Sequence, residues 1–281
     1  MFAALTSVFS LLAFKGLTQE VRPAGPKSAA EAREDAYRAN NLGVALLEQY
    51  KYKEGAEAFT RALQLDPKLN LARINLSIAL FNVPDLPGAQ REAEKAAAAD
   101  ANAPQPHYIL GLIAKSQNRA DEAVASFQRV LKLDPRDTGA NVNLGQLYVQ
   151  QKKYAEAIAA FRTAIQVEPY NLTGLYNLGL TLTRAGQREE GQQLINRFQQ
   201  LRASGAGTTI GQNYLEQGRY AEALASTGAE PELIERAVPE VKFTDATESM
   251  LPGAKVGGGE GAVALSGSLK NGLTDAAERD L

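Results

Sequence analysis

The residue types best suited to catalysis are scarce in this sequence. His107 is the one histidine among 281 residues, and there is no cysteine. Disulfides, cysteine-based zinc sites, thiol catalysis and metal centres built from several histidines are therefore excluded. A histidine general base also needs an assembled set of partners, and the spacing of the chain places no serine or carboxylate pair beside His107. We expect His107 to be a packing or surface residue, and the chain to be no enzyme and to need no cofactor or metal.

Asparagine side chains recur at regular intervals and offer chemistry of another kind. Asn41 and Asn75 are separated by one interval, Asn143 and Asn177 by the same interval, and Ile109 interrupts the row at its midpoint. An amide both donates and accepts hydrogen bonds, so such a row can pair with the backbone of an extended peptide of any sequence. The alternative is that asparagine is favoured here because it bonds to neighbouring helices, since buried polar groups need partners in any case.

The asparagines belong to a longer repeat with a period of about 34 residues. Pro135 and Pro169 close two similar segments one period apart, and Pro67 closes a third, two periods before Pro135. Within each segment apolar residues recur at the spacing of one helix face, and the residue before each proline disfavours further helix. The units counted from the prolines are 36–69, 70–103, 104–137, 138–171 and about 172–203. A Leu-Gly or Leu-Ser pair recurs in register at Leu42-Gly43, Leu76-Ser77, Leu110-Gly111, Leu144-Gly145 and Leu178-Gly179.

This pattern resembles the tetratricopeptide repeat, which combines a Leu-Gly pair, a later small residue, an aromatic residue and a closing proline within each period. The resemblance covers residues 36 to about 225. It implies an all-α fold, an α/α superhelical solenoid in which hairpins stack because one hairpin cannot bury its apolar face alone. Five full units and a degenerate sixth, which restarts near Thr209 and is expected to cap the array, would occupy residues 28–228.

Two local features modify this expectation. Ser28 and Glu31 have the spacing of a capping box and are expected to open the first helix. The second unit carries Pro84 and Pro87 at its inter-helix turn and an alanine-rich second helix. Its hairpin is expected to form, but to be softer than its neighbours.

The resemblance also implies a binding surface, because the first helix of each tetratricopeptide hairpin lines a concave groove. The asparagine row looks like that of the tetratricopeptide superhelix in O-linked N-acetylglucosamine transferases. The Lys/Asn/Arg clamp by which other members grip chaperone C-terminal carboxylates is not matched, since Asn40 and Val44 occupy its first positions, so that partner class is not expected. We expect the groove to take an extended peptide or a helix of another protein, although several groove positions could equally pack between hairpins. The groove positions besides the row are Tyr37, Asn40, Val44, Ile74, Ile78, Phe81, Tyr108, Leu112, Val142, Gln146, Tyr176, Leu180 and Arg184.

Charge and the amino terminus bear on partners and location. Lys+Arg number 30 and Asp+Glu 32, so the formal net charge is −2 and the basic excess of a nucleic-acid binder is missing. The apolar run Phe2–Phe14 is shorter than the roughly 20 residues of a membrane-spanning helix and suits a signal peptide. No basic residue precedes it, and an apolar helix on the first repeat is the alternative. We expect a periplasmic or secreted protein, with a cytoplasmic one as the alternative, and membrane contact only through residues 1–27.

The carboxyl-terminal residues 229–281 fall outside the repeat. Their glycines, with Gly257–Gly259 in one run, favour a partly disordered or β-prone tail. Residues 241–247 are similar to the opening of the FG-GAP, CRTAC-like β-propeller domain of bacterial secreted tetratricopeptide proteins, so these residues are either a tail or part of a second domain. The sequence therefore predicts a protein-protein interaction scaffold. The alternative is the recruiting arm of a larger secreted protein with a propeller or enzymatic module beyond Leu281.

Overall fold

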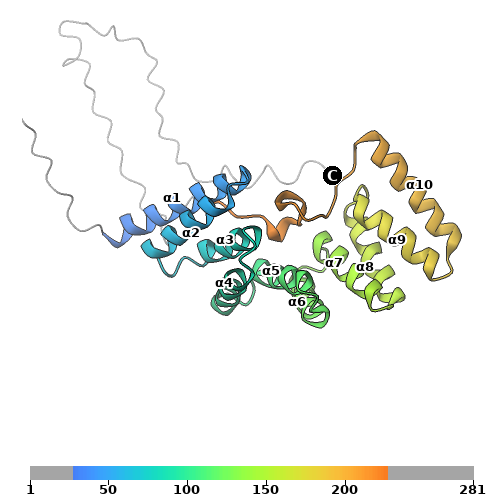
Figure 1. The fold of residues 1–281 in the computed structure, drawn as a ribbon, viewed down its shortest axis with the longest axis horizontal. Helices are drawn as coiled ribbons and strands as arrows, with labels where there is room; N and C mark the ends of the chain where they lie inside the picture. Colours follow the sequence, from blue (N-terminus) through green and yellow to red (C-terminus); the bar gives the residue numbers. More distant parts are fainter. Residues whose placement is uncertain (1–27, 227–281) are drawn as a thin grey trace, which may run out of the picture. The chain divides into compact units, whose positions relative to one another are not determined.

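Helical hairpins dominate the computed structural model of the chain, which describes residues 28–226 (Figure 1). Within this range ten α-helices alternate with short turns and pair into five hairpins, so the predicted all-α solenoid is confirmed. The described part contains no β-strand beyond an isolated bridge between Asn171 and Thr208, and no helix in it is long and apolar enough to cross a membrane. The helices are α1 (Ala29–Glu48), α2 (Tyr52–Leu65), α3 (Asn70–Asn82), α4 (Leu86–Ala99), α5 (Pro104–Ser116), α6 (Ala120–Leu133), α7 (Thr138–Gln150), α8 (Tyr154–Val167), α9 (Leu172–Arg184) and α10 (Arg188–Ser204).

The ends of the helices follow from the residues that flank them. The expected capping box opens α1, because Ser28 Oγ accepts from the N–H of Glu31 at 3.2 Å and Glu31 Oε2 accepts from the N–H of Ser28 at 2.7 Å. Asp66 ends α2 in an extended conformation with ψ 95°, as a residue before proline must, and Asp134 ends α6 in the same way with ψ 90°. The Asp-Pro pairs therefore separate successive hairpins.

Close packing inside each hairpin depends on the small residue of the Leu-Gly pair. A Cβ atom added to Gly43 would lie 2.5 Å from Phe59 of the second helix, and one added to Gly145 would lie 2.5 Å from Phe161. Both phenylalanines are fully buried. The glycine lets the first helix approach the aromatic ring, and the ring fills the space between the two helices, which is why the two residue types recur together.

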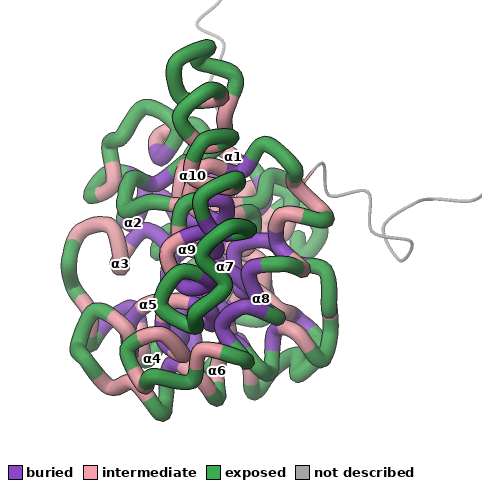
Figure 2. The backbone as a smooth tube through the Cα atoms, turned by 90° about the vertical axis from the view of Figure 1, so that its right-hand side faces the viewer, coloured by how far each residue is buried: buried purple, intermediate pink, exposed green. Residues whose placement is uncertain are grey.

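The turns inside the hairpins share one backbone conformation. Tyr50, Asn118, Lys152 and Gly186, which occupy the same position of their repeats, have φ values of 60°, 57°, 60° and 89°. Pro84 occupies this position in the second hairpin, with φ 26°. A proline ring favours φ near −65°, so this turn is strained. Figure 2 shows the buried residues on the inner parts of the helices, while α10, whose one buried residue is Gly191, is mostly exposed.

The degenerate sixth unit does not form a helical hairpin. Its residues contain two 3-10 helices, η1 (Tyr214–Glu216) and η2 (Arg219–Ala221), with irregular backbone on either side. They turn back along the first helices instead of continuing the stack beyond α10 (Figure 1, orange). Gly211 and Gly218 match the glycine of the Leu-Gly pair and the turn position of the other repeats, but the pattern is lost after Ser226, so the unit lacks the second helix that would cover a first one. The segments 1–27 and 229–281, with the signal-like and propeller-like stretches, lie outside the described residues.

Candidate functional site

The chain fills much of its own concave groove. We call residues 206–226 the strap; they follow α10 and run back through the groove from α9, past α7 and α5, to α3 and α1, so that they contact the first helix of every hairpin (Figure 1). The strap begins at α9, where the N–H of Leu172 donates to the carbonyl of Thr208 at 2.8 Å. The hydroxyl of Thr173 then accepts from the N–H of Ile210 at 2.9 Å and donates to its carbonyl at 3.1 Å.

A close approach fixes the middle of the strap against α5 and α7. The hydroxyl of the fully buried Tyr108 donates to the carbonyl of Gln217 at 2.5 Å. The next residue, Gly218, has φ +102°, and a Cβ atom there would lie 2.4 Å from Tyr108 Oη and 3.4 Å from the Cα atom of Gly139. Gly139 is equally crowded, since its own Cβ would lie 2.4 Å from the same hydroxyl. Two backbones therefore meet across one tyrosine, and glycine is needed on both.

Two carboxylates before α7 hold the next residues of the strap. Asp137 is buried and caps α7, since its Oδ1 accepts from the N–H of Ala140 at 2.6 Å, while its Oδ2 lies 3.1 Å from Arg219 Nε. Arg219 also pairs with Asp134, whose Oδ2 accepts from the hydroxyl of Tyr220 at 2.9 Å. Burial raises the pKa of Asp137 to about 6, the N–H of Ala140 opposes that shift, and the charge of Glu168 adds to it. The guanidinium supplies the positive partner that a buried carboxylate requires.

Two asparagines of the predicted row hold the end of the strap by its backbone. Asn75 accepts from the N–H of Leu224 at 2.9 Å and donates to its carbonyl at 2.8 Å. Asn41 does the same with Ser226, at 2.9 and 2.6 Å. Asn40 adds a hydrogen bond to the carbonyl of Leu224 at 3.2 Å and accepts from Asn75 at 2.8 Å. Each amide thus pairs with both polar groups of one strap residue, and Leu224 and Ser226 are held at alternate positions of the strap.

The other two asparagines of the row have different partners. Asn143 donates to the carbonyl of Gly139 at 2.9 Å and to Tyr108 Oη at 3.2 Å, and its oxygen accepts from Lys115 Nζ at 2.6 Å. Asn177 donates to the carbonyl of Thr173 in its own helix at 2.8 Å. These residues match the alternative interpretation, in which the asparagine bonds within and between helices. Ile109, which breaks the row, is fully buried.

The remaining groove positions divide between core and surface. Tyr37 and Val142 are buried, as are Val44, Ile74 and Ile78, so these positions pack between hairpins and do not line an open surface. Tyr176 is 42% exposed, and with Asn177, Phe198 and Arg202 it borders a cavity of about 260 Å³. Arg184 is exposed further along α9. The part of the groove over α9 is therefore open.

The partly buried amine of Lys115 lies beneath the strap. Lys115 donates to Asn143 and to Gln146 Oε1, the latter at 2.5 Å, and it has no carboxylate partner among the described residues. Burial lowers its pKa to about 8. It borders a cavity of about 440 Å³ between the strap and the groove, lined also by Phe81, Leu112 and Gln217. The strap therefore does not fill the groove completely.

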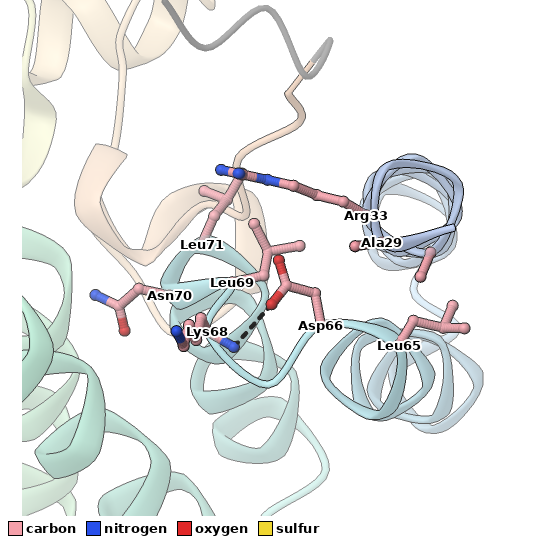
Figure 3. Close-up of a pocket in the computed structure, with 9 residues that line it drawn as sticks. Ala29, Arg33, Leu65, Asp66, Lys68, Leu69, Asn70 and Leu71 are labelled. Carbon is pink, nitrogen blue, oxygen red and sulfur yellow. Dashed lines mark hydrogen bonds between the residues drawn. The ribbon is translucent and has the colours of Figure 1, made fainter. Parts of the chain in front are cut away.

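Neither of two other features adds a site. The first is a cavity of about 670 Å³ between the start of α1 and the start of α3. Figure 3 shows the residues that line it. Its carboxylate, Asp66, accepts from the N–H of Lys68 at 3.0 Å and so belongs to the turn. His107 is half-buried beside the backbone of Ala101, and burial, followed by the charge of Arg129, lowers its pKa. No group of three potential metal-ligating His, Asp or Glu side chains occurs in the described part of the chain.

Comparison with known proteins identifies the repeat. The family profile described as tetratricopeptide repeat matches residues 74–138, 108–172 and 142–206. Residues 74–206 of the chain are tetratricopeptide repeats. Solved structures share the fold. "MamA 41-end from Desulfovibrio magneticus RS-1" is 18% identical with a TM-score of 0.54, and the match covers 61% of this chain and 97% of that one. "Functional Characterization of Pseudomonas Aeruginosa pilF" is 23% identical with a TM-score of 0.56, covering 68% and 82%. "Crystal structure of YrrB: a TPR protein with an unusual peptide-binding site" is 22% identical with a TM-score of 0.50, covering 61% and 88%.

The tetratricopeptide fold makes the chain a scaffold of the kind that binds other proteins. What the sequence did not reveal is the strap and the groove residues that hold it, Thr173, Asp134 and Asp137. The one clue was the irregularity of the sixth repeat, which restarts about two residues early and loses the pattern after Ser226. Whether the groove positions bind a partner stays a prediction.

Proposed function

We propose that this tetratricopeptide array is an interaction scaffold whose concave face binds an extended segment of a partner protein. The observation that supports this most directly is the pairing of Asn41 and Asn75 with the strap. Each amide satisfies the N–H and the carbonyl of one residue without contacting its side chain through a hydrogen bond. A surface that holds one extended backbone in this way has the chemistry to hold another.

The open part of the groove, over α9, is the proposed binding site for such a partner. It combines the exposed ring of Tyr176, the amide of Asn177 and the charged side chains of Arg184 and Arg202. An aromatic side chain beside arginine is the combination most often found at the energetic centre of protein interfaces. The solved structure of YrrB, described as a TPR protein with an unusual peptide-binding site, supports the proposal for a chain of the same fold.

Peptide display against the full chain tests the proposal. Peptides selected from a random library are measured by fluorescence anisotropy against wild type and against Tyr176→Ala/Arg184→Glu. We expect an affinity loss of at least tenfold. The matched control is Lys132→Glu/Leu133→Ala, an exposed pair on the second helix of the third hairpin, which should bind as wild type does. Equal losses in both variants, or a library that yields no ligand, would contradict the proposal.

Export is a separate proposal, supported by the apolar run Phe2–Phe14. Fractionation of cells that express the full chain with a carboxyl-terminal tag tests it. Mature protein in the periplasm or medium is the expected result, and exclusively cytoplasmic, unprocessed protein would refute it.

A further inference from the structure

The strap has the contacts of a bound peptide ligand. It is held mainly through its own backbone, by the side chains of Thr173, Tyr108, Asn75 and Asn41, which belong to four different first helices. The two helices of a hairpin, by contrast, are held together by buried apolar side chains such as Phe59. Hydrogen bonds to the main chain of the bound segment also hold foreign peptides at the edges of β-sheets.

We propose that the strap is a resident ligand of the groove, and that the partner is an extended peptide carrying the strap's own pattern of glycine, a basic residue, an aromatic residue and a small residue, which displaces it. This inference rests on the proposed peptide-binding function and deepens it, because it names the chemistry of the ligand.

The first element of the pattern is steric. The position of Gly218 admits no side chain, because Tyr108 Oη and the backbone of Gly139 close it, and its φ of +102° favours glycine independently. The steric constraint does not belong to the strap, since Tyr108 and Gly139 are fixed in α5 and α7. Any peptide that follows the same path must therefore place glycine here.

The second element is electrostatic. Asp134, at the end of α6, and Asp137, at the start of α7, face the strap, and Arg219 and Tyr220 satisfy them. Asp137 is nearly inaccessible, with 2% of its surface exposed, so a displacing peptide that brought no cation would leave a buried carboxylate unpaired. The small residue of the pattern follows from Ala221, which is fully buried.

The strap is also attached to the groove more weakly than the hairpins are to one another. Its regular structure is limited to two 3-10 helices of three residues each. Tyr214 is buried, but Leu215 and Leu224 are 51% and 39% exposed. Segments with few buried apolar contacts open at a lower free energy than the hairpins around them. The cavity of about 440 Å³ beneath Gly211 and Gln217 gives a better-fitting peptide room for contacts that the strap does not make.

A labelled synthetic peptide with the sequence of residues 209–226 tests the inference on the full chain. The opened variant is Gly218→Val/Arg219→Glu, which removes the strap's fit and leaves the groove unchanged. The control is Gln212→Glu/Leu215→Val, which makes comparable changes at two exposed strap positions. We expect the peptide to bind the opened variant at least tenfold more tightly than wild type or control. The same peptide with Gly218→Val should not bind.

Equal binding to wild type and opened variant would overturn the inference, as would no binding to an opened variant whose helix content and thermal unfolding match wild type. Foreign peptides that bind the groove while the strap peptide does not would refute the inference and leave the proposed function standing. Binding of the strap peptide with no foreign ligand ever found would instead remove the proposed function, and the groove would be reserved for the chain's own strap.

Discussion

Asn75 and Leu224 exchange two hydrogen bonds although they lie in the second and the sixth repeat units. The amide of Asn75 accepts from the N–H of Leu224 at 2.9 Å and donates to its carbonyl at 2.8 Å. Both hydrogen bonds involve the backbone of Leu224, so they do not depend on its side chain. Removing the side chain of Asn75 should therefore be the most direct way to detach the strap from the second hairpin.

Replacing Asn75 with alanine should loosen the strap. The variant loses both hydrogen bonds to Leu224, at about 1 kcal/mol each, so the strap should open roughly ten- to thirtyfold more often. Trypsin cleavage after Arg219, an exposed strap residue, measures this opening. Asn177→Ala is the matched control, because Asn177 holds the same repeat position but its side chain donates within its own helix. Equal cleavage of the two variants would show that the asparagine row does not retain the strap.

Alanine at Gly218 should release the strap for a different reason. The substitution places a Cβ atom 2.4 Å from Tyr108 Oη and forces a side chain onto φ +102°. Gly205→Ala separates the two effects, since Gly205 has φ +70° and no atom within 4 Å of an added Cβ. We expect Gly205→Ala to cost about 1 kcal/mol in stability while the strap stays protected. Gly218→Ala should accelerate hydrogen exchange at Leu224 and Ser226 at least tenfold. Unchanged exchange would mean that the approach of Gly218 to Tyr108 does not hold the strap.

The repeat architecture was predictable because each of its rules is local. Leu-Gly pairs, buried phenylalanines and Asp-Pro pairs each act within one hairpin or at one boundary, and they recur with the period of the repeat. The row of asparagines was visible for the same reason. Its division was not, because Asn41 and Asn75 have partners in the strap, whereas Asn143 and Asn177 have partners in the helices.

The strap could not be predicted because it depends on contacts between distant residues. Its sequence, including Tyr214 and Ala221, still resembles a repeat, and only the tertiary structure gives these residues other roles. Tyr214 is buried by packing against Tyr52, with ring centroids 6.1 Å apart, and its hydroxyl accepts from the N–H of Ala223 at 2.8 Å. Asp137 likewise reads as a loop residue until the strap brings Arg219 to it.

The partly buried amine of Lys115 should make stability depend on pH. Its pKa is about 8 in the folded chain, below the 10.5 of an exposed lysine. Between these values the unfolded chain binds a proton that the folded chain has lost, so raising the pH favours folding. Relative to Lys115→Met, wild type should gain about 2 kcal/mol of unfolding free energy between about pH 7 and pH 9.5. Denaturant titrations measure the difference, and Lys132→Met, an exposed lysine on α6, provides the baseline. If the unfolding free energy of wild type, relative to that of Lys115→Met, does not rise between these pH values, the amine is hydrated in the folded chain.

Asparagine at Pro84 should stabilise the second hairpin. Pro84 has φ 26° at a position where the other hairpins reach 57° to 89°, a region that asparagine tolerates and the proline ring opposes. The equivalent residue Asn118 also donates its N–H to the carbonyl of Lys115 at 3.1 Å, a bond that proline cannot make. Relief of strain and a new hydrogen bond to Phe81 should outweigh the lost rigidity, for a net gain of about 1 kcal/mol. Thermal unfolding and hydrogen exchange in α3 and α4 measure the gain.

Pro87→Ala is the control for this substitution, since Pro87 lies in the first turn of α4, where proline is favourable, and its loss should not stabilise the hairpin. Exchange in α3 and α4 that is no slower in Pro84→Asn than in wild type would show that this turn is unstrained. The softness expected of the second hairpin would then have its source in α4, where the buried positions Ala89, Ala93 and Ala96 offer less apolar surface than the phenylalanines of the other hairpins.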